Sequence, residues 1–275
     1  MTRIDFYKMS GSGNDFILID NRDDKLNGYS LPKLAISLCR SKYSVGADGL
    51  IIIEKSDGFD FKWQFFNADG TEAEMCGNGA RCAARLAYIL GIGSNRLNFE
   101  TKAGIVKAEV EGNLVKLEMP LPKQISLNEI LRLDDEQVAF HFINIGVPHT
   151  IIFPEKGLEN VEIKQLGKEI RFHPRFQPSG TNVDFVKKIG ENSIKIRTYE
   201  RGVEDETLSC GTGAVAASLI CHGLNMVNSP VKVYTKSGEI LEVSFIEKVG
   251  GFREVFLKGE ARLLYQGKLF EEALK

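Results

Sequence analysis

The sequence has little of what metal centres and disulfide frameworks need. It contains five cysteines and four histidines in 275 residues, and no two cysteines stand at Cys-x-x-Cys spacing. Because such spacing, or clustered histidine, is usual in structural zinc sites, we expect no metal. The odd number and irregular spacing of the cysteines exclude a disulfide framework and favour free thiols in a reducing cytoplasm.

Long hydrophobic runs and an excess of charge are also missing. No uninterrupted apolar stretch approaches the roughly 20 residues that cross a membrane, and the first residues lack the apolar core of a signal peptide. The formal net charge of −2 disfavours nucleic acid or an anionic membrane as the main partner. We therefore expect a cytoplasmic protein with a small-molecule substrate, and a homodimer is left open as its assembly.

What the sequence does contain is a repeated cysteine motif. Cys-Gly-x-Gly-Ala occurs at 76–80 and at 210–214, and each copy opens an apolar run of small residues that predicts a helix. The spacing from Cys76 to Cys210, which we call the repeat offset, also separates Ile17 from Ile151, Gly46 from Gly180, and Thr101 from Thr235. Chance similarity of Gly-rich loops would explain one pair but not a common register. We therefore predict two copies of one fold unit.

Short apolar runs rich in Ile, Val, Phe and Tyr dominate the chain and predict strands. These runs are 16–19, 50–53, 61–66, 106–119, 143–153, 182–186 and 194–199. Helical patterns cover 31–41, 79–90, 163–171 and 213–222, with Gly91 and Gly223 as stops. We predict an α+β fold of two similar domains, 1–122 and 123–261. Each is a curled, mostly antiparallel sheet around a central helix, and the active site lies in the cleft between them.

Two thiols that face one substrate from opposite sides can invert a stereocentre. One thiolate removes a proton from a carbon, and the other thiol delivers a proton to the opposite face. A free cysteine pKa of about 8.5 lies near working pH, so both forms coexist with modest tuning. A helix N-terminus favours the thiolate, and its backbone N–H groups can bind a carboxylate. An α-amino acid carries both the carboxylate and the Cα–H that such a site needs.

Several further motifs carry a resemblance to a known family. They lie at 8–16, 46–49, 66–70, 75–82, 146–149, 181–185, 199–202 and 209–213. With these motifs the sequence resembles the diaminopimelate epimerases, which interconvert LL- and meso-diaminopimelate without a cofactor. The resemblance covers nearly the whole chain. It implies a place in lysine and cell-wall precursor biosynthesis, and a C-terminal segment, 262–275, that returns to the first domain.

The resemblance also implies roles for particular residues. Cys76 and Cys210 are the catalytic acid/base pair. The residues that contact the substrate are Asn14, Asn67, Asn182, Glu200 and Arg201. The residues that bind the carboxylate at the reacting centre are Gly77, Asn78, Gly211 and Thr212. His149 and Glu200 tune the reacting groups. The chain departs from the family at Val147, where many members carry Asn, and at Gly49, where some carry Gln.

Other interpretations stay open at this point. Val147 and Gly49 motivate a racemase of the same fold that acts on another amino acid, such as histidine or proline. A thiol-based redox or small-molecule-binding protein would exchange no substrate Cα–H with solvent. A pyridoxal-phosphate racemase would reveal its cofactor by absorbance. The remaining cysteines, Cys39, Cys82 and Cys221, are predicted to lie in the core.

Overall fold

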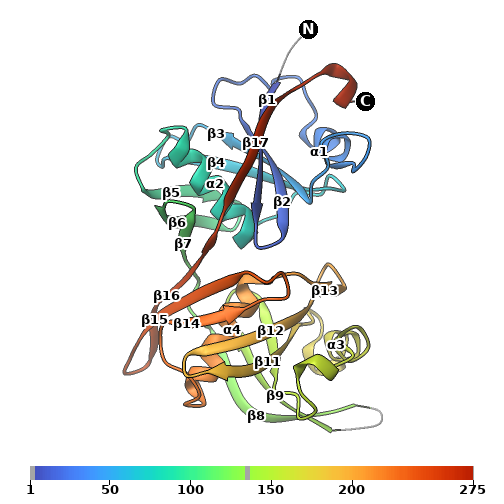
Figure 1. Ribbon diagram of the computed structural model, residues 1–275, viewed down its shortest axis with the longest axis vertical. Helices are drawn as coiled ribbons and strands as arrows, with labels where there is room; N and C mark the ends of the chain where they lie inside the picture. Colours follow the sequence, from blue (N-terminus) through green and yellow to red (C-terminus); the bar gives the residue numbers. More distant parts are fainter. Residues whose placement is uncertain (1–3, 134–136, 275) are drawn as a thin grey trace. The chain divides into compact units, whose positions relative to one another are not determined.

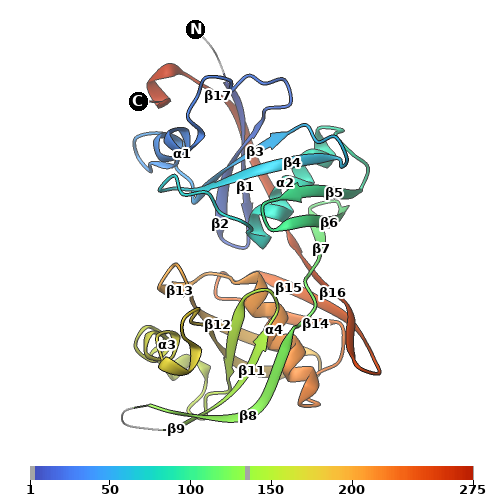
Figure 2. The ribbon, with the colours of Figure 1, turned by 180° about the vertical axis from the view of Figure 1, so that it is seen from behind.

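The structure is a computed structural model that describes residues 4–133 and 137–274. The chain divides into two compact units, one formed by Met1–Leu117 with Gly259–Lys275 and the other by Glu118–Lys258 (Figures 1 and 2). The sequence prediction set these limits at residues 122 and 261. Each unit is a sheet with one long helix against it, which is the predicted α+β class.

Unit 1 holds the first seven strands and the last one. The strands are β1 (Ile4–Gly11), β2 (Asn14–Asp20), β3 (Gly49–Glu54), β4 (Phe61–Asn67), β5 (Arg96–Thr101), β6 (Gly104–Glu111), β7 (Leu114–Glu118) and β17 (Arg262–Leu269). They pair in the order β17-β1-β2-β3-β4-β5-β6-β7, with β2/β3 and β4/β5 parallel and the other pairs antiparallel. The helices are α1 (Leu31–Cys39), α2 (Gly77–Ile89) and the short η3 (Glu271–Leu274). Strand β17 therefore completes the unit by lying beside β1 (Figure 1).

Unit 2 repeats this arrangement. Its strands are β8 (Gln124–Arg132), β9 (Gln137–Asn144), β10 (Pro148–Ile152), β11 (Asn182–Gly190), β12 (Ser193–Glu200), β13 (Asp205–Thr207), β14 (Val231–Tyr234), β15 (Ile240–Lys248) and β16 (Gly251–Glu260). They pair in the order β8-β9-β10-β11-β12-β14-β15-β16, with β13 on β12, and the parallel pairs are β10/β11 and β12/β14. The helices are η1 (Leu158–Asn160), α3 (Ile163–Arg171), η2 (Pro174–Phe176) and α4 (Gly211–Gly223).

The two units share strand register as well as strand order. Ile17 lies opposite Leu50 in the parallel pair β2/β3. Ile151 lies opposite Asp184 in the parallel pair β10/β11, so the partners in both pairs are separated by the same length of chain. Helices α2 and α4 each contain 13 residues, and the same offset separates their first residues. The predicted repeat of one fold unit is therefore confirmed at the level of residue pairing.

Each long helix is buried by the sheet of its own unit. Helix α2 contacts strands β1, β2, β3, β6 and β17, and α4 contacts strands β9, β10, β11, β12, β14 and β15. Small side chains let the strands approach on several sides, and Ala214, Ala216 and Ala217 are fully buried. Cys82 and Cys221 lie in these helices and are also fully buried, as predicted. Burial raises the pKa of Cys221 to about 12.

The structure corrects two predicted strands and one predicted helix end. The run 106–119 is a hairpin that turns at Gly112, and the run 143–153 is broken at Gly146; both glycines have positive φ, 62° and 99°. Gly223 is the last residue of α4 rather than its stop. Asn225 takes the left-handed position there, with φ 58°, as Gly91 does after α2 with φ 66°. Asparagine tolerates this conformation, so the helix ends without a glycine at that position.

Candidate active site

Cys76 is the N-cap residue of α2. Its backbone is extended, with φ −144° and ψ 119°, and its Sγ accepts a hydrogen bond from the Gly79 N–H at 3.5 Å. The free N–H groups of a helix start carry partial positive charge, which stabilises negative charge on a group placed there. The cysteine therefore occupies the position in its helix where a thiolate costs least.

Cys210 occupies the same position on α4. Its Sγ accepts a hydrogen bond from the Gly213 N–H at 3.4 Å and lies 3.4 Å from the Thr212 hydroxyl. Its side chain is buried, whereas Cys76 is only partly buried. The two predicted catalytic cysteines thus share one local geometry, each within its own unit.

Cys210 has an electrostatic environment that opposes ionisation. Burial raises the pKa of its thiol well above the ordinary value, and the negative charges of Glu200 and then Asp184 raise it further. The hydrogen bonds from Thr212 and Gly213 act in the opposite direction but are smaller. The surroundings of Cys210 therefore favour the neutral thiol, in spite of its place at a helix N-terminus.

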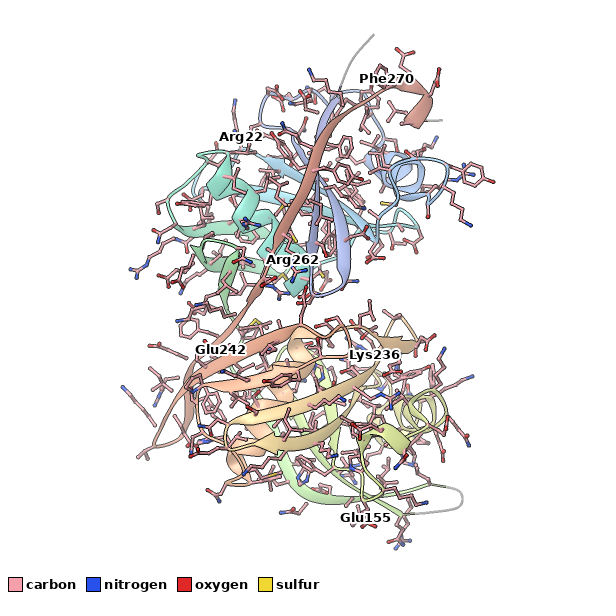
Figure 3. The ribbon with its side chains drawn as sticks, in the orientation of Figure 1. Arg22, Glu155, Lys236, Glu242, Arg262 and Phe270 are labelled. Carbon is pink, nitrogen blue, oxygen red and sulfur yellow. The ribbon has the colours of Figure 1, made fainter. Side chains whose placement is uncertain are left out.

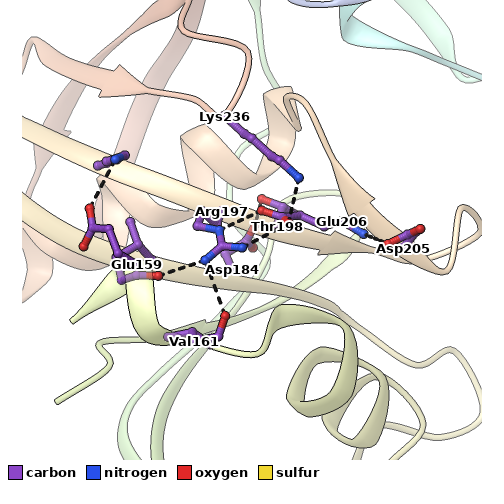
Figure 4. Close-up of polar contacts among 10 residues, drawn as sticks. Glu159, Val161, Asp184, Arg197, Thr198, Asp205, Glu206 and Lys236 are labelled. Atoms are coloured by element: carbon purple, nitrogen blue, oxygen red, sulfur yellow. Dashed lines mark hydrogen bonds and ion pairs between the residues drawn. The ribbon is translucent and has the colours of Figure 1, made fainter. Parts of the chain in front are cut away.

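Asp184 forms a buried polar cluster beneath the start of α4. Its carboxylate lies 2.7 Å from His149 Nδ1. It also accepts a 2.7 Å hydrogen bond from the hydroxyl of Thr198, which is labelled with Asp184 in Figure 4. His149 and Asp184 are both fully buried. A Cβ at Gly213 would overlap Asp184 Oδ1, so glycine there admits the carboxylate to the helix start. His149 was predicted to tune the site, but Asp184 and Thr198 were not singled out.

The predicted ligands Asn182, Glu200 and Arg201 lie together at adjoining strand ends in unit 2. Asn182 is opposite His149 in the sheet. Its amide donates to the Pro148 carbonyl at 3.1 Å and accepts from the Arg201 backbone N–H at 2.9 Å. Burial raises the pKa of Glu200. The nearby Thr207 hydroxyl and the charge of His149 oppose this rise, and the charge of Asp184 adds to it.

An ion-pair network fixes the hairpin that carries Glu200 and Arg201. Arg197 on β12 contacts both carboxylate oxygens of Glu206 on β13, at 2.7 and 3.1 Å. Lys236 reaches the same carboxylate at 2.8 Å (Figures 3 and 4). Arg197 also donates to the Leu158 carbonyl at 3.0 Å. The turn between the two strands is therefore held by contacts outside it, which orients the residues at its start.

In unit 1 the predicted ligands Asn14 and Asn78 lie in direct contact. Asn78 Nδ2 donates to Asn14 Oδ1 at 2.7 Å, and Asn14 Nδ2 donates to Asp48 Oδ2 at 3.0 Å. Asn67 lies at the end of β4, exposed, with its amide donating to the Thr71 hydroxyl at 3.0 Å. Gly77 and Asn78 form the first turn of α2 as Gly211 and Thr212 do in α4. Asp48 was missed as a site residue, although it stands in the quoted motif 46–49.

The departure at Gly49 has a packing explanation. A Cβ on Gly49 would lie 2.6 Å from Phe65 Cε2 and 2.8 Å from the Phe66 carbonyl oxygen. The space that a glutamine would need at its base is therefore filled by the neighbouring strand. Val147 lies in the turn before β10 and is partly buried.

Within residues 4–133 and 137–274, no group of three or more His, Cys, Asp or Glu side chains is placed to hold a metal ion. No helix in the described part of the chain has the length and apolar content needed to span a membrane.

Comparison with known proteins identifies a family and a fold. The family model described as "Diaminopimelate epimerase" matches residues 6–121 and 141–264. A protein named diaminopimelate epimerase from Aquifex aeolicus is 47% identical over 99% of this chain and 100% of its own length. One of the same name from Hydrogenobaculum sp. is 43% identical over 96% of this chain and 98% of its own.

Solved structures with little sequence similarity share the fold. A PhzF-family phenazine biosynthesis protein from Bacillus anthracis aligns with a TM-score of 0.70 at 14% identity, covering 98% of this chain and 100% of that one. A hydroxyproline epimerase from Agrobacterium vitis aligns with a TM-score of 0.68 at 16% identity, covering 98% and 92%. At this identity the likeness concerns the fold alone.

Proposed function

Because the chain belongs to the diaminopimelate epimerase family, we propose that it interconverts LL- and meso-diaminopimelate by proton transfer between the Cys76 and Cys210 thiols. The observation that carries this proposal is the equivalence of the two cysteines. Each caps the N-terminus of the central helix of its unit, at matching positions of the repeat. We propose that both units address one substrate molecule, whose reacting carbon lies between the two sulfur atoms.

The proton balance of the reaction follows from the two protonation states. The Cys76 thiolate takes the proton from Cα, and the electron pair of the broken C–H bond delocalises into the adjacent carboxylate. The Cys210 thiol then delivers its proton to the opposite face of the same carbon. The product has the inverted configuration, Cys76 has become a thiol and Cys210 a thiolate. The environment of Cys210, which raises the pKa of its thiol, supports its assignment as the donor.

Backbone hydrogen-bond donors and the exclusion of water supply the rate enhancement that acid–base catalysis does not. General acid–base catalysis contributes roughly 10²–10⁴-fold, which is too little for so weak a carbon acid. The free N–H groups at the starts of α2 and α4, at Gly77, Asn78, Gly211 and Thr212, suit the carboxylate and the charge that develops next to it. Arg201 suits the distal carboxylate by bidentate pairing, and Glu200 suits an ammonium group. We assign Asn14, Asn67 and Asn182 to substrate contacts. We assign His149 to tuning of the Cys210 side.

The direct test is proton NMR of the purified protein with LL-diaminopimelate in D₂O, with no cofactor added. The proposal predicts the meso isomer, with deuterium at the inverted carbon. Exchange and inversion of histidine or proline in place of diaminopimelate would identify a racemase of the same fold with another substrate. Absence of exchange with all three amino acids would overturn the proposal.

A further inference from the structure

A directed chain of hydrogen bonds runs through the ligand side of unit 1. Arg81 lies on α2 and is fully buried, and its Nη2 donates to Asn78 Oδ1 at 2.9 Å. Asn78 Nδ2 donates to Asn14 Oδ1 at 2.7 Å, and Asn14 Nδ2 donates to Asp48 Oδ2 at 3.0 Å. We refer to these four residues as the amide relay.

The charged ends of the amide relay decide its direction. A guanidinium can only donate, and an ionised carboxylate can only accept. Asn78 must therefore turn its oxygen toward Arg81, and Asn14 must turn its nitrogen toward Asp48. Turning either amide over would place oxygen against oxygen or nitrogen against nitrogen. The orientation of both amides thus follows from chemistry, which matters because nitrogen and oxygen of an amide are otherwise hard to tell apart.

Both ends of the amide relay are themselves held in place. Arg81 also donates to the Ser12 hydroxyl at 2.6 Å and to the Glu260 carbonyl at 3.3 Å. Asp48 Oδ2 accepts a second hydrogen bond, from the Asp15 backbone N–H at 3.1 Å. Asp15 in turn pairs with the buried Lys8 at 2.5 Å. Glu260 precedes β17, so the C-terminal return of the chain contributes to fixing the relay.

The amide relay leaves one N–H of Asn14 unused. Asn78 is 4% exposed and serves as a connector, whereas Asn14 is only partly buried. Each amide nitrogen carries two protons and uses one inside the relay. Asn14 therefore keeps one Nδ2–H outside the relay, a donor that the relay polarises, and the direction of the relay fixes on which side of the amide this donor lies.

We propose that Arg81 and Asp48 are positioning residues that fix Asn14 as a hydrogen-bond donor to a carboxylate oxygen of the substrate. The identity of the substrate in this inference rests on the proposed function, whereas the direction of the relay does not depend on it. Neither residue touches the substrate: each acts through an asparagine.

The main test is a double-mutant cycle on KM for LL-diaminopimelate with Asp48→Asn and Arg81→Gln. Each change removes the charged group that fixes the direction of the relay at one end. We expect KM to rise on the order of tenfold, with kcat altered much less. Because both residues act through one relay, the KM of the double variant should be little higher than that of the poorer single variant.

The matched control is Arg85→Lys. Arg85 lies on the same helix and donates to the Gly112 and Ala261 carbonyls, so this change should leave KM unchanged. Costs in KM that add, or a loss confined to kcat, would overturn the inference.

A second readout needs no turnover. Asp48 is exposed, so Asp48→Asn should fold even where the buried Arg81→Gln does not. The side-chain amide signals of Asn14 and Asn78, recorded by ¹⁵N–¹H NMR without substrate, should both shift in Asp48→Asn. Signals that stay in place would contradict the relay, even in a protein that epimerises diaminopimelate. If the wild-type protein does not epimerise diaminopimelate but Asp48→Asn still shifts both amide signals, the proposed function is rejected and the relay is retained.

Discussion

Cys76 and Cys210 occupy the same place on equivalent helices, but different side chains lie beneath the two helix starts. In unit 1 the third residue of the helix, Gly79, faces Ile51. In unit 2 the third residue of the helix, Gly213, lies against Asp184. The backbone of the repeat therefore places each sulfur, whereas one buried carboxylate distinguishes the two sites.

This difference teaches how one fold unit can serve two chemical roles. A helix N-terminus favours a thiolate in either unit. In unit 2, burial and the charges of Glu200 and Asp184 outweigh that effect and raise the pKa of Cys210. The proposed two-base inversion needs one thiolate and one thiol at the same time, and the charges near Cys210 favour the thiol there.

Removing either sulfur should have the largest effect. Cys76→Ala and Cys210→Ala are each expected to lower kcat for epimerisation by at least about a thousandfold, because each removes a group that transfers a proton. Cys82→Ala and Cys221→Ala are the matched controls, since these thiols lie in the same two helices but are fully buried. Near-normal turnover in either active-site variant would reject the two-thiol mechanism.

Neutralising the carboxylate beneath α4 should make the two sites more alike. In Asp184→Asn a negative charge near Cys210 is lost, which lowers the pKa of the thiol. We expect the pH at which iodoacetamide modifies Cys210 to fall by roughly one unit or more. Mass spectrometry of the modified peptide measures this midpoint.

The control for the Asp184→Asn change is another aspartate of the same unit. Asp205 is exposed to solvent at its ion pair with Lys164, so Asp205→Asn should leave the Cys210 midpoint in place. An unchanged midpoint in Asp184→Asn would show that burial, rather than this carboxylate, keeps Cys210 neutral.

The glycines at the helix starts should differ in a smaller, purely structural way. A Cβ added at Gly213 would overlap the fixed Asp184 carboxylate, whereas one at Gly79 meets only the end of the Ile51 side chain, at 3.1 Å. Gly213→Ala should cost about 1–3 kcal/mol of folding free energy, and Gly79→Ala clearly less. Thermal unfolding followed by circular dichroism compares the two; equal losses would indicate that Asp184 moves aside readily.

Much of the fold could be predicted from the sequence because the glycine and cysteine motifs indicate where helices begin. The paired cysteine motifs located both long helices to within two residues of their observed starts, and the apolar pattern placed α3 at its observed limits. The broken strand runs were not foreseen, because a single glycine turn does not interrupt an apolar pattern.

The charges of the site were harder to predict than its backbone. Asp184 stands in an apolar strand, where alternation alone does not reveal that its side chain points inward to His149, 35 residues away. The buried position of Arg81 was equally hard to predict, because a basic side chain in a helix usually faces solvent. The partners of both come from distant segments, and only the folded chain brings them together.

The most direct test of the account is the isotope pattern at the first few per cent of conversion of LL-diaminopimelate in D₂O. A thiol exchanges its proton with solvent, so the donor carries deuterium while the base removes protium. The account predicts deuterium in the newly formed meso isomer and none in the remaining LL substrate. Deuterium appearing equally in substrate and product, or protium returned to the inverted carbon, would mean that a single group both removes and delivers the proton.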